Sequence, residues 1–177
     1  SIPYNTSYLS VDENLKTNWK RMLGDKTKLR IGVLFTSNSI AYITKFRKIE
    51  FDKMVPILCD NFEFINLSID VTDDEIKLFK QHNVKTYHNF MGDFYVTAGL
   101  VTALDLVITV DTYMAHLAGG LGVPTLVLLH KYGSDWRWFM DREDSPFYSC
   151  VKLIRQTERN KFDDMVINIQ HELQRML

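Results

Sequence analysis

A strand–helix–strand pattern at 106–129 constrains the fold of this chain more than any other feature. The run 106–110 is apolar and rich in β-branched residues, which is typical of a strand buried on both faces. A helical segment follows at 113–119, and the glycines after it together with Pro124 prevent its continuation. A second apolar run at 125–129 then predicts a parallel neighbour strand, which makes the whole stretch a βαβ crossover.

The rest of the chain repeats this alternation of strands and helices. Strands are predicted at 29–35, 63–67, 84–87, 106–110, 125–129 and 151–155, and helices at 10–23, 51–60, 72–82, 94–104, 113–119 and 162–175. Such alternation predicts an α/β fold with one Rossmann-like, doubly wound parallel sheet of about six strands in the order 3-2-1-4-5-6 and helices on both faces. Residues 29–177 form this domain, and residues 1–28 are an N-terminal extension whose helix packs on it.

Composition excludes several classes of function. The 177 residues carry 21 basic and 22 acidic side chains, a net charge of −1, without a basic run, so a nucleic-acid partner is not expected. No apolar run is long enough to span a membrane, and the first residues do not resemble a signal peptide. Two isolated cysteines, Cys59 and Cys150, fit a buried, reduced pair, and together these features predict a cytoplasmic protein.

One cluster of polar residues remains after the common motifs are excluded. The sequence has neither a dinucleotide fingerprint nor a P-loop, a nucleophile elbow or a metal-binding spacing. Asp111 and Thr112 directly follow a predicted buried strand, where the free N–H groups of a helix start suit a phosphate. His116 lies four residues after Thr112, on the same helix face, and could donate to a phosphate or sugar oxygen. The same spacing also fits a structural role, in which Asp111 caps the helix and His116 is a core histidine.

The predicted strand order brings a second polar segment to the same place. Strands one and four are neighbours at the point where the strand order reverses, and ligands of open α/β sheets bind there. Thr36, Ser37 and Asn38 follow strand one and are therefore expected beside Asp111 and Thr112 at one crevice. This expectation depends on topology alone.

The segment 107–124 resembles the signature of the heptosyltransferase-like GT-B glycosyltransferases of family 9. The segments 135–138 and 142–148 are similar to a branch of this group found behind tetratricopeptide repeats in bacterial proteins. The resemblance covers about 29–156. It implies a fold like the C-terminal half of a GT-B enzyme, which binds a nucleotide-diphosphate sugar and transfers the sugar to an acceptor without a metal or other cofactor.

The resemblance also implies roles for individual residues. The donor diphosphate and sugar would contact Asp111, Thr112 and His116. Asn38 matches the turn after strand one in the relatives, and Arg47 is the nearest match to the arginine of their basic loop. Tyr113 stands where relatives often have a small residue, so it would narrow the pocket or stack on the base.

A single GT-B half leaves the general base open. The base would come from this domain, from a segment outside it or from a partner chain, and tetratricopeptide repeats or a second domain are the expected upstream partners. Within the chain the candidate carboxylates are Asp93, Asp135 and Asp144, and each also fits a cap, a loop hydrogen bond or an ion pair. The alternative function is a non-catalytic remnant that binds a nucleotide or another protein.

Overall fold

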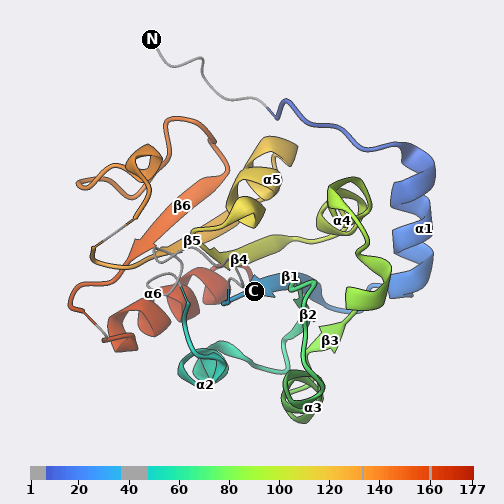
Figure 1. Ribbon diagram of the computed structural model, residues 1–177, viewed down its shortest axis with the longest axis horizontal. Coiled ribbons are helices and arrows are strands. Elements are labelled where there is room, and N and C mark those ends of the chain that lie inside the picture. Colours follow the sequence, from blue (N-terminus) through green and yellow to red (C-terminus); the bar gives the residue numbers. More distant parts are fainter. Residues whose placement is uncertain (1–6, 37–47, 133, 160) are drawn as a thin grey trace.

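A six-stranded parallel sheet forms the centre of the protein in a computed structural model (Figure 1). The structure describes residues 7–36, 48–132, 134–159 and 161–177. The strands are β1 (Leu29–Leu34), β2 (Phe62–Asn66), β3 (Lys85–Thr86), β4 (Leu106–Val110), β5 (Thr125–Leu129) and β6 (Val151–Arg155). Their order in the sheet is β3-β2-β1-β4-β5-β6, which confirms the predicted order 3-2-1-4-5-6.

Six α-helices and three 3-10 turns accompany the strands, with α1 before the first strand and α6 after the last. The helices are α1 (Glu13–Leu23), α2 (Phe51–Met54), α3 (Asp73–Gln81), α4 (Phe94–Val101), α5 (Tyr113–Leu121) and α6 (Asp163–Gln174). The 3-10 turns are η2 (Val55–Ile57), η3 (His88–Phe90) and η4 (Trp136–Trp138). These counts refer to the described part of the chain.

The helices cover both faces of the sheet, as the sequence predicts. On one face, Ile108 and Val110 of β4 belong to an apolar core with residues of α2, α3 and α6. On the other face, Val107 of β4 packs in a second core with residues of α1, α4 and α5. Figure 1 shows these two helical layers on opposite sides of the sheet. Successive strand residues thus enter opposite cores, which explains the uninterrupted apolar runs.

Three local predictions are wrong. The helix expected over 51–60 ends as α-helix at Met54 and continues only as the turn η2, which contains Pro56, a residue without a backbone N–H. The helix predicted over 94–104 ends at Val101, because the backbone hydrogen bonds of the following turn span three residues instead of four. Cys59, expected to be buried, is exposed.

The N-terminal helix packs tightly on the domain. Trp19 of α1 is 2% exposed, and its indole Nε1 donates to the Val96 carbonyl of α4 at 2.8 Å. Gly99 makes this approach possible, since a Cβ there would lie 2.6 Å from the indole ring. Within the described residues, we find no helix whose length and apolar character would allow it to cross a membrane.

Candidate functional site

The carboxyl ends of β1 and β4 lie side by side. Leu34 of β1 pairs with Thr109 of β4 in parallel register. Thr36 follows Leu34 by two residues, and Asp111 follows Thr109 by two residues. The two polar segments therefore leave the sheet at the same edge, as the topology predicts. Ser37, Asn38 and Arg47, the other predicted members of this edge, lie outside the described residues.

Thr112 begins α5 at this edge. It is the N-cap, and its Oγ1 accepts from the Met114 N–H at 3.3 Å, so the predicted helix start is confirmed. The same hydroxyl lies 3.3 Å from the Thr109 Oγ1. At 9% exposure it is part of a buried polar turn. Such a turn holds the first N–H groups of the helix at the end of the sheet.

Asp111 binds the loop after β5. Its side chain is buried, and its Oδ1 accepts from the Trp138 Nε1 at 2.8 Å. Its Oδ2 accepts from the Asp135 backbone N–H at 3.1 Å. The bond from Trp138 is buried and the bond from Asp135 is partly buried, and hydrogen bonds to a carboxylate are worth more than neutral ones. Asp111 therefore fixes the position of η4 against the start of α5. Its predicted contact with a donor stays a prediction.

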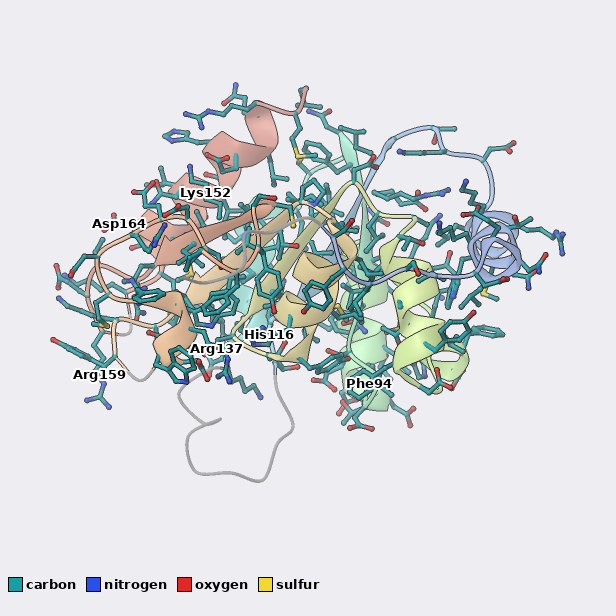
Figure 2. All side chains as sticks on the ribbon, turned by 90° about the horizontal axis from the view of Figure 1, so that it is seen from above. Phe94, His116, Arg137, Lys152, Arg159 and Asp164 are labelled. Carbon is teal, nitrogen blue, oxygen red and sulfur yellow. The ribbon has the colours of Figure 1, made fainter. Side chains whose placement is uncertain are left out.

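His116 packs between two aromatic side chains. Its imidazole stacks on the Trp138 ring, with centroids 5.2 Å apart and planes inclined by 16°. Its Nδ1 lies 3.0 Å from the Tyr148 hydroxyl. Figure 2 labels His116 among the side chains drawn on the ribbon. The imidazole is thus fixed both by stacking and by a hydrogen bond, one helical turn after Thr112.

Tyr113 lies beside the helix start and is 36% exposed. Its ring packs edge-on against Phe94 of α4, with centroids 5.0 Å apart. Burial, with a smaller contribution from the negative charge of Asp70, raises the pKa of the Tyr113 hydroxyl. The hydroxyl is therefore neutral at physiological pH. Tyr113 and Phe94 form a partly exposed aromatic wall at the start of α5.

The three candidate carboxylates have structural partners. Asp93 is the N-cap of α4, where its Oδ1 accepts from the Val96 N–H at 2.8 Å. Asp135 caps η4 and forms an ion pair with Arg137 at 3.0 Å. Asp144 is exposed and accepts two hydrogen bonds from Arg142, at 2.7 and 2.6 Å, which lower the pKa of its carboxyl. Their assignment as general bases stays a prediction.

Trp138 follows strand five, where the sequence favours a tryptophan that anchors the loop on the core or stacks on a ligand, and the structure confirms the anchoring; Tyr148 was not assigned a role by the sequence. Trp138 is completely buried and connects Asp111 with His116, and Tyr148 contacts His116 from the segment before β6. Trp138 lies in the segment 135–138, and Tyr148 lies in the segment 142–148, which the sequence marks only by resemblance. Neither segment has helix or strand periodicity, so nothing in the pattern indicates which side chains point inward.

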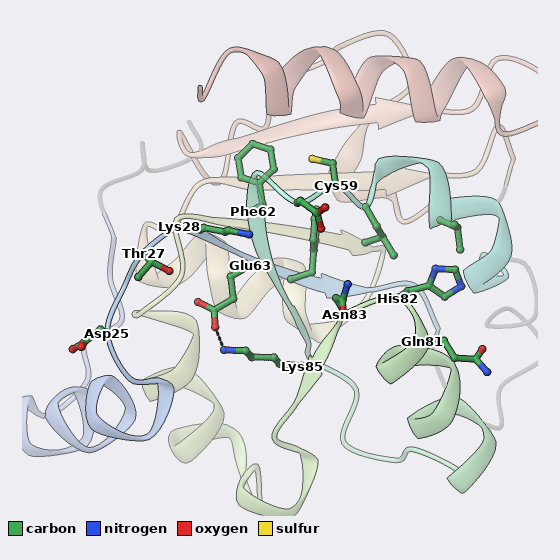
Figure 3. A pocket seen from close by; sticks show the side chains of 14 residues that line it. Asp25, Thr27, Lys28, Cys59, Phe62, Glu63, Gln81, His82, Asn83 and Lys85 are labelled. Atoms are coloured by element: carbon green, nitrogen blue, oxygen red, sulfur yellow. Dashed lines mark hydrogen bonds and ion pairs between the residues drawn. The ribbon is translucent and has the colours of Figure 1, made fainter.

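The edge with the site is opposite a hollow at the amino ends of the strands. That hollow has a volume of about 480 Å³ and lies where β1, β2 and β3 begin. Figure 3 shows Glu63 and Lys85 paired within it. At the carboxyl edge, a small cavity of about 30 Å³ adjoins Thr36. The two edges are separated by the length of the strands.

The fold is similar to halves of two solved glycosyltransferases. One is a glycosyl transferase family 9 protein from Veillonella parvula DSM 2008, with a TM-score of 0.58, 13% identity and coverage of 84% of this chain and 42% of that one. The other is the ADP-heptose LPS heptosyltransferase II of E. coli, with a TM-score of 0.64, 14% identity and coverage of 95% and 52%. The chain thus spans about half the length of each. No protein-family model matches the sequence, and no curated protein matches it significantly. At this low identity the similarity concerns the fold, and the chain has the fold of one half of a heptosyltransferase-like GT-B glycosyltransferase.

Proposed function

We propose that this chain is the donor-binding half of a glycosyltransferase and holds a nucleoside-diphosphate sugar at the start of α5. The observation that carries the proposal is the placement of Thr112 and His116. Thr112 caps α5 at the carboxyl edge of the sheet, and His116 follows one turn later. A helix start at the point where the strand order reverses is a favourable place for a diphosphate, because its N–H groups and dipole attract negative charge.

The fold supports this assignment. One solved neighbour is named an ADP-heptose heptosyltransferase, and this chain matches about half of it. In the proposed reaction, an acceptor oxygen displaces the nucleoside diphosphate at the anomeric carbon of the sugar, and the acceptor loses a proton. The N–H groups of α5 and nearby basic side chains would balance the charge of the leaving diphosphate, so the proposal requires neither a metal nor another cofactor. The acceptor site and the general base are assigned to a second domain or partner chain.

Nucleotide binding without sugar transfer is the second candidate function. It is favoured because the three candidate carboxylates for the general base, all among the described residues, already have hydrogen-bond or ion-pair partners. Asp93 and Asp135 cap helical segments, and Asp144 is paired with Arg142. The hydrogen bonds from Arg142 lower the pKa of Asp144, which makes this carboxylate a poorer proton acceptor. Turnover of a labelled nucleotide sugar by the chain alone would argue for transfer, and binding without turnover would favour the second candidate.

Isothermal titration of the chain with adenosine, uridine and guanosine diphosphates tests the proposed site. We expect at least one to bind, and Thr112→Val to weaken that binding by about tenfold or more, as loss of a hydrogen bond to a charged ligand does. Thr72→Val is the matched control. Thr72 also caps a helix, α3, but on the other face of the sheet. The proposal fails if none of the diphosphates binds, or if both variants weaken binding equally.

A further inference from the structure

The side chain of Tyr148 is held by α5 and by the N-terminal segment that carries Tyr8. A Cβ at Gly119 of α5 would lie 2.6 Å from the tyrosine ring, so the ring rests directly on the helix backbone. Tyr8 stacks on the same ring with centroids 6.4 Å apart, and the two hydroxyls are 3.4 Å apart. The backbone N–H groups of Tyr8 and Leu9 donate to the Gly120 carbonyl at 3.0 and 2.9 Å, which holds this N-terminal segment against α5. The Tyr148 hydroxyl therefore has one well-defined position, at His116.

The Tyr148 hydroxyl keeps its proton. Burial raises the pKa of Tyr148 above its ordinary range. The hydroxyl lies 3.0 Å from the Nδ1 of His116. A neutral phenol is a stronger acid than an imidazole N–H, and an imidazole nitrogen is a stronger base than a phenol oxygen. The hydroxyl has one proton, and Nδ1 at 3.0 Å is both closer and more basic than the Tyr8 hydroxyl at 3.4 Å, so Tyr148 donates to Nδ1 and the Tyr8 hydroxyl donates to Tyr148.

We infer that Tyr148 is a positioning residue that donates to the Nδ1 of His116 and thereby holds the neutral imidazole with its proton on Nε2. In a neutral histidine one ring nitrogen carries the proton, and the hydrogen bond to the other selects which one. Trp138 fixes the plane of the same ring by stacking, and Asp111 fixes Trp138 through its Nε1. The result is a preset N–H donor at Nε2. If the proposed function holds, this Nε2–H donates a hydrogen bond to a phosphate or sugar oxygen of the nucleotide sugar.

Nitrogen-15 spectra of the histidine rings in the full chain test the tautomer without any ligand. At alkaline pH, where histidines are neutral, His116 is expected to have an unprotonated Nδ1 and a protonated Nε2, with its signals assigned by their loss in His116→Gln. Tyr148→Phe keeps the ring that packs on Gly119 but removes the hydroxyl. We expect it to bring the two ring nitrogen shifts of His116 closer together, because the hydrogen bond to Nδ1 that favours one tautomer is lost.

Tyr8→Phe is the matched control, since it removes the neighbouring hydroxyl without touching His116. We expect the His116 tautomer to be unchanged in this variant. Unchanged signals from the other four histidines verify that each variant is folded. A proton on Nδ1 in the wild type, or a His116 spectrum unaffected by Tyr148→Phe, would overturn the inference.

Titration with adenosine and uridine diphosphates tests the use of this donor, which depends on the proposed function. Tyr148→Phe should weaken binding by about twofold to tenfold, the range for one neutral hydrogen bond. In a His116→Gln background, the same change should cause no further loss, because Tyr148 acts through His116. Additive losses would overturn this coupling. If neither diphosphate binds the wild type, the proposed function fails, while the ring spectra still decide whether Tyr148 sets the tautomer.

Discussion

Asp111 connects residues that are far apart in the sequence. Its two carboxylate oxygens accept from Trp138 and from the backbone of Asp135, more than twenty positions later in the chain. Trp138 in turn supports the ring of His116 by stacking. A change at Asp111 should therefore affect both the stability of the fold and the geometry around His116, even without direct contact between Asp111 and a ligand.

Asp111→Asn tests this role at the scale of one residue. An amide can accept only on its oxygen, so either Trp138 or the Asp135 N–H loses its partner in a buried place. We expect the free energy of unfolding to fall by about 1–3 kcal/mol, as measured by urea denaturation followed by tryptophan fluorescence. Asp144→Asn, at an exposed carboxylate paired with Arg142, is the control and should have a smaller effect. Equal effects of the two changes would contradict a special role for Asp111.

The residues around Asp111 also show how far prediction from sequence can go. Asp111, Thr112 and His116 could be selected because they follow a buried strand at helical spacing. The contacts of Trp138 and Tyr148 with these residues could not be predicted, because both come from irregular segments whose side-chain directions follow no period. The role of Asp111 toward the loop was missed for the same reason. A carboxylate after a strand indicates a polar site but does not identify its partner.

Among the elements, α5 is shaped by what packs on its C-terminal half. Its helix carries Gly119 and Gly120, which are poor helix formers. A Cβ at Gly119 would meet Tyr148, and one at Gly120 would lie 2.8 Å from Leu9. These small residues allow close approach of the segments that support His116, so the helix gives up intrinsic propensity for packing.

Gly119→Ala tests whether packing against Tyr148 outweighs helix propensity at this position. Helix propensity alone would stabilise the protein by about 1 kcal/mol, whereas overpacking against a rigid ring costs about 1–3 kcal/mol. We expect a net loss of stability in urea denaturation, accompanied by a shift of the His116 ring signals as Tyr148 moves. Gly92→Ala is the control, because a Cβ there meets nothing within 4 Å. A more stable Gly119→Ala protein with unchanged His116 signals would contradict this account of α5.

The strands and their order could be predicted because a strand that is buried on both faces has an uninterrupted apolar sequence. Val107 faces one core while Ile108 faces the other, so the whole run is apolar. The lengths of helices were predicted less well. The segment after Phe51 looks helical by composition, yet the α-helix ends at Met54, just before the 3-10 turn that contains Pro56.

The two edges of the sheet have different roles in the whole molecule. The carboxyl edge carries Thr112 and His116, and the amino edge carries a charged cluster that joins three strands. In that cluster, Arg30 of β1 donates to Glu63 of β2 at 2.8 Å, and Lys85 of β3 pairs with the same carboxylate. Arg30 is 3% exposed, so its charge depends on Glu63 for compensation. Stability at the amino edge should therefore be separable from ligand binding at the carboxyl edge.

The pH dependence of stability in Glu63→Gln, compared with its ligand affinity, tests whether the two edges are independent. Burial disfavours the charged form of Glu63, but hydrogen bonds from Lys85 and Arg30 outweigh it and hold the pKa of this carboxyl below its ordinary value of 4.5. A lowered pKa in the folded state means that the ionised group stabilises the fold above the unfolded pKa, about 4.3. This contribution is lost as the pH falls through the lower, folded value. We therefore expect Glu63→Gln to lower the free energy of unfolding at neutral pH by about 1–3 kcal/mol.

The difference between wild type and Glu63→Gln should then shrink as the pH falls below about 4, since the wild type loses the same contribution by protonation. Urea denaturation across this range measures it, with Glu13→Gln as a control at an exposed ion pair of α1. The affinity for the nucleoside diphosphate that binds the wild type should stay the same in Glu63→Gln at neutral pH, because the substitution lies at the opposite edge of the sheet. A constant stability difference at all pH values would contradict the lowered pKa. A loss of nucleotide affinity in a folded Glu63→Gln protein would place the binding site, or its coupling, at the amino edge instead.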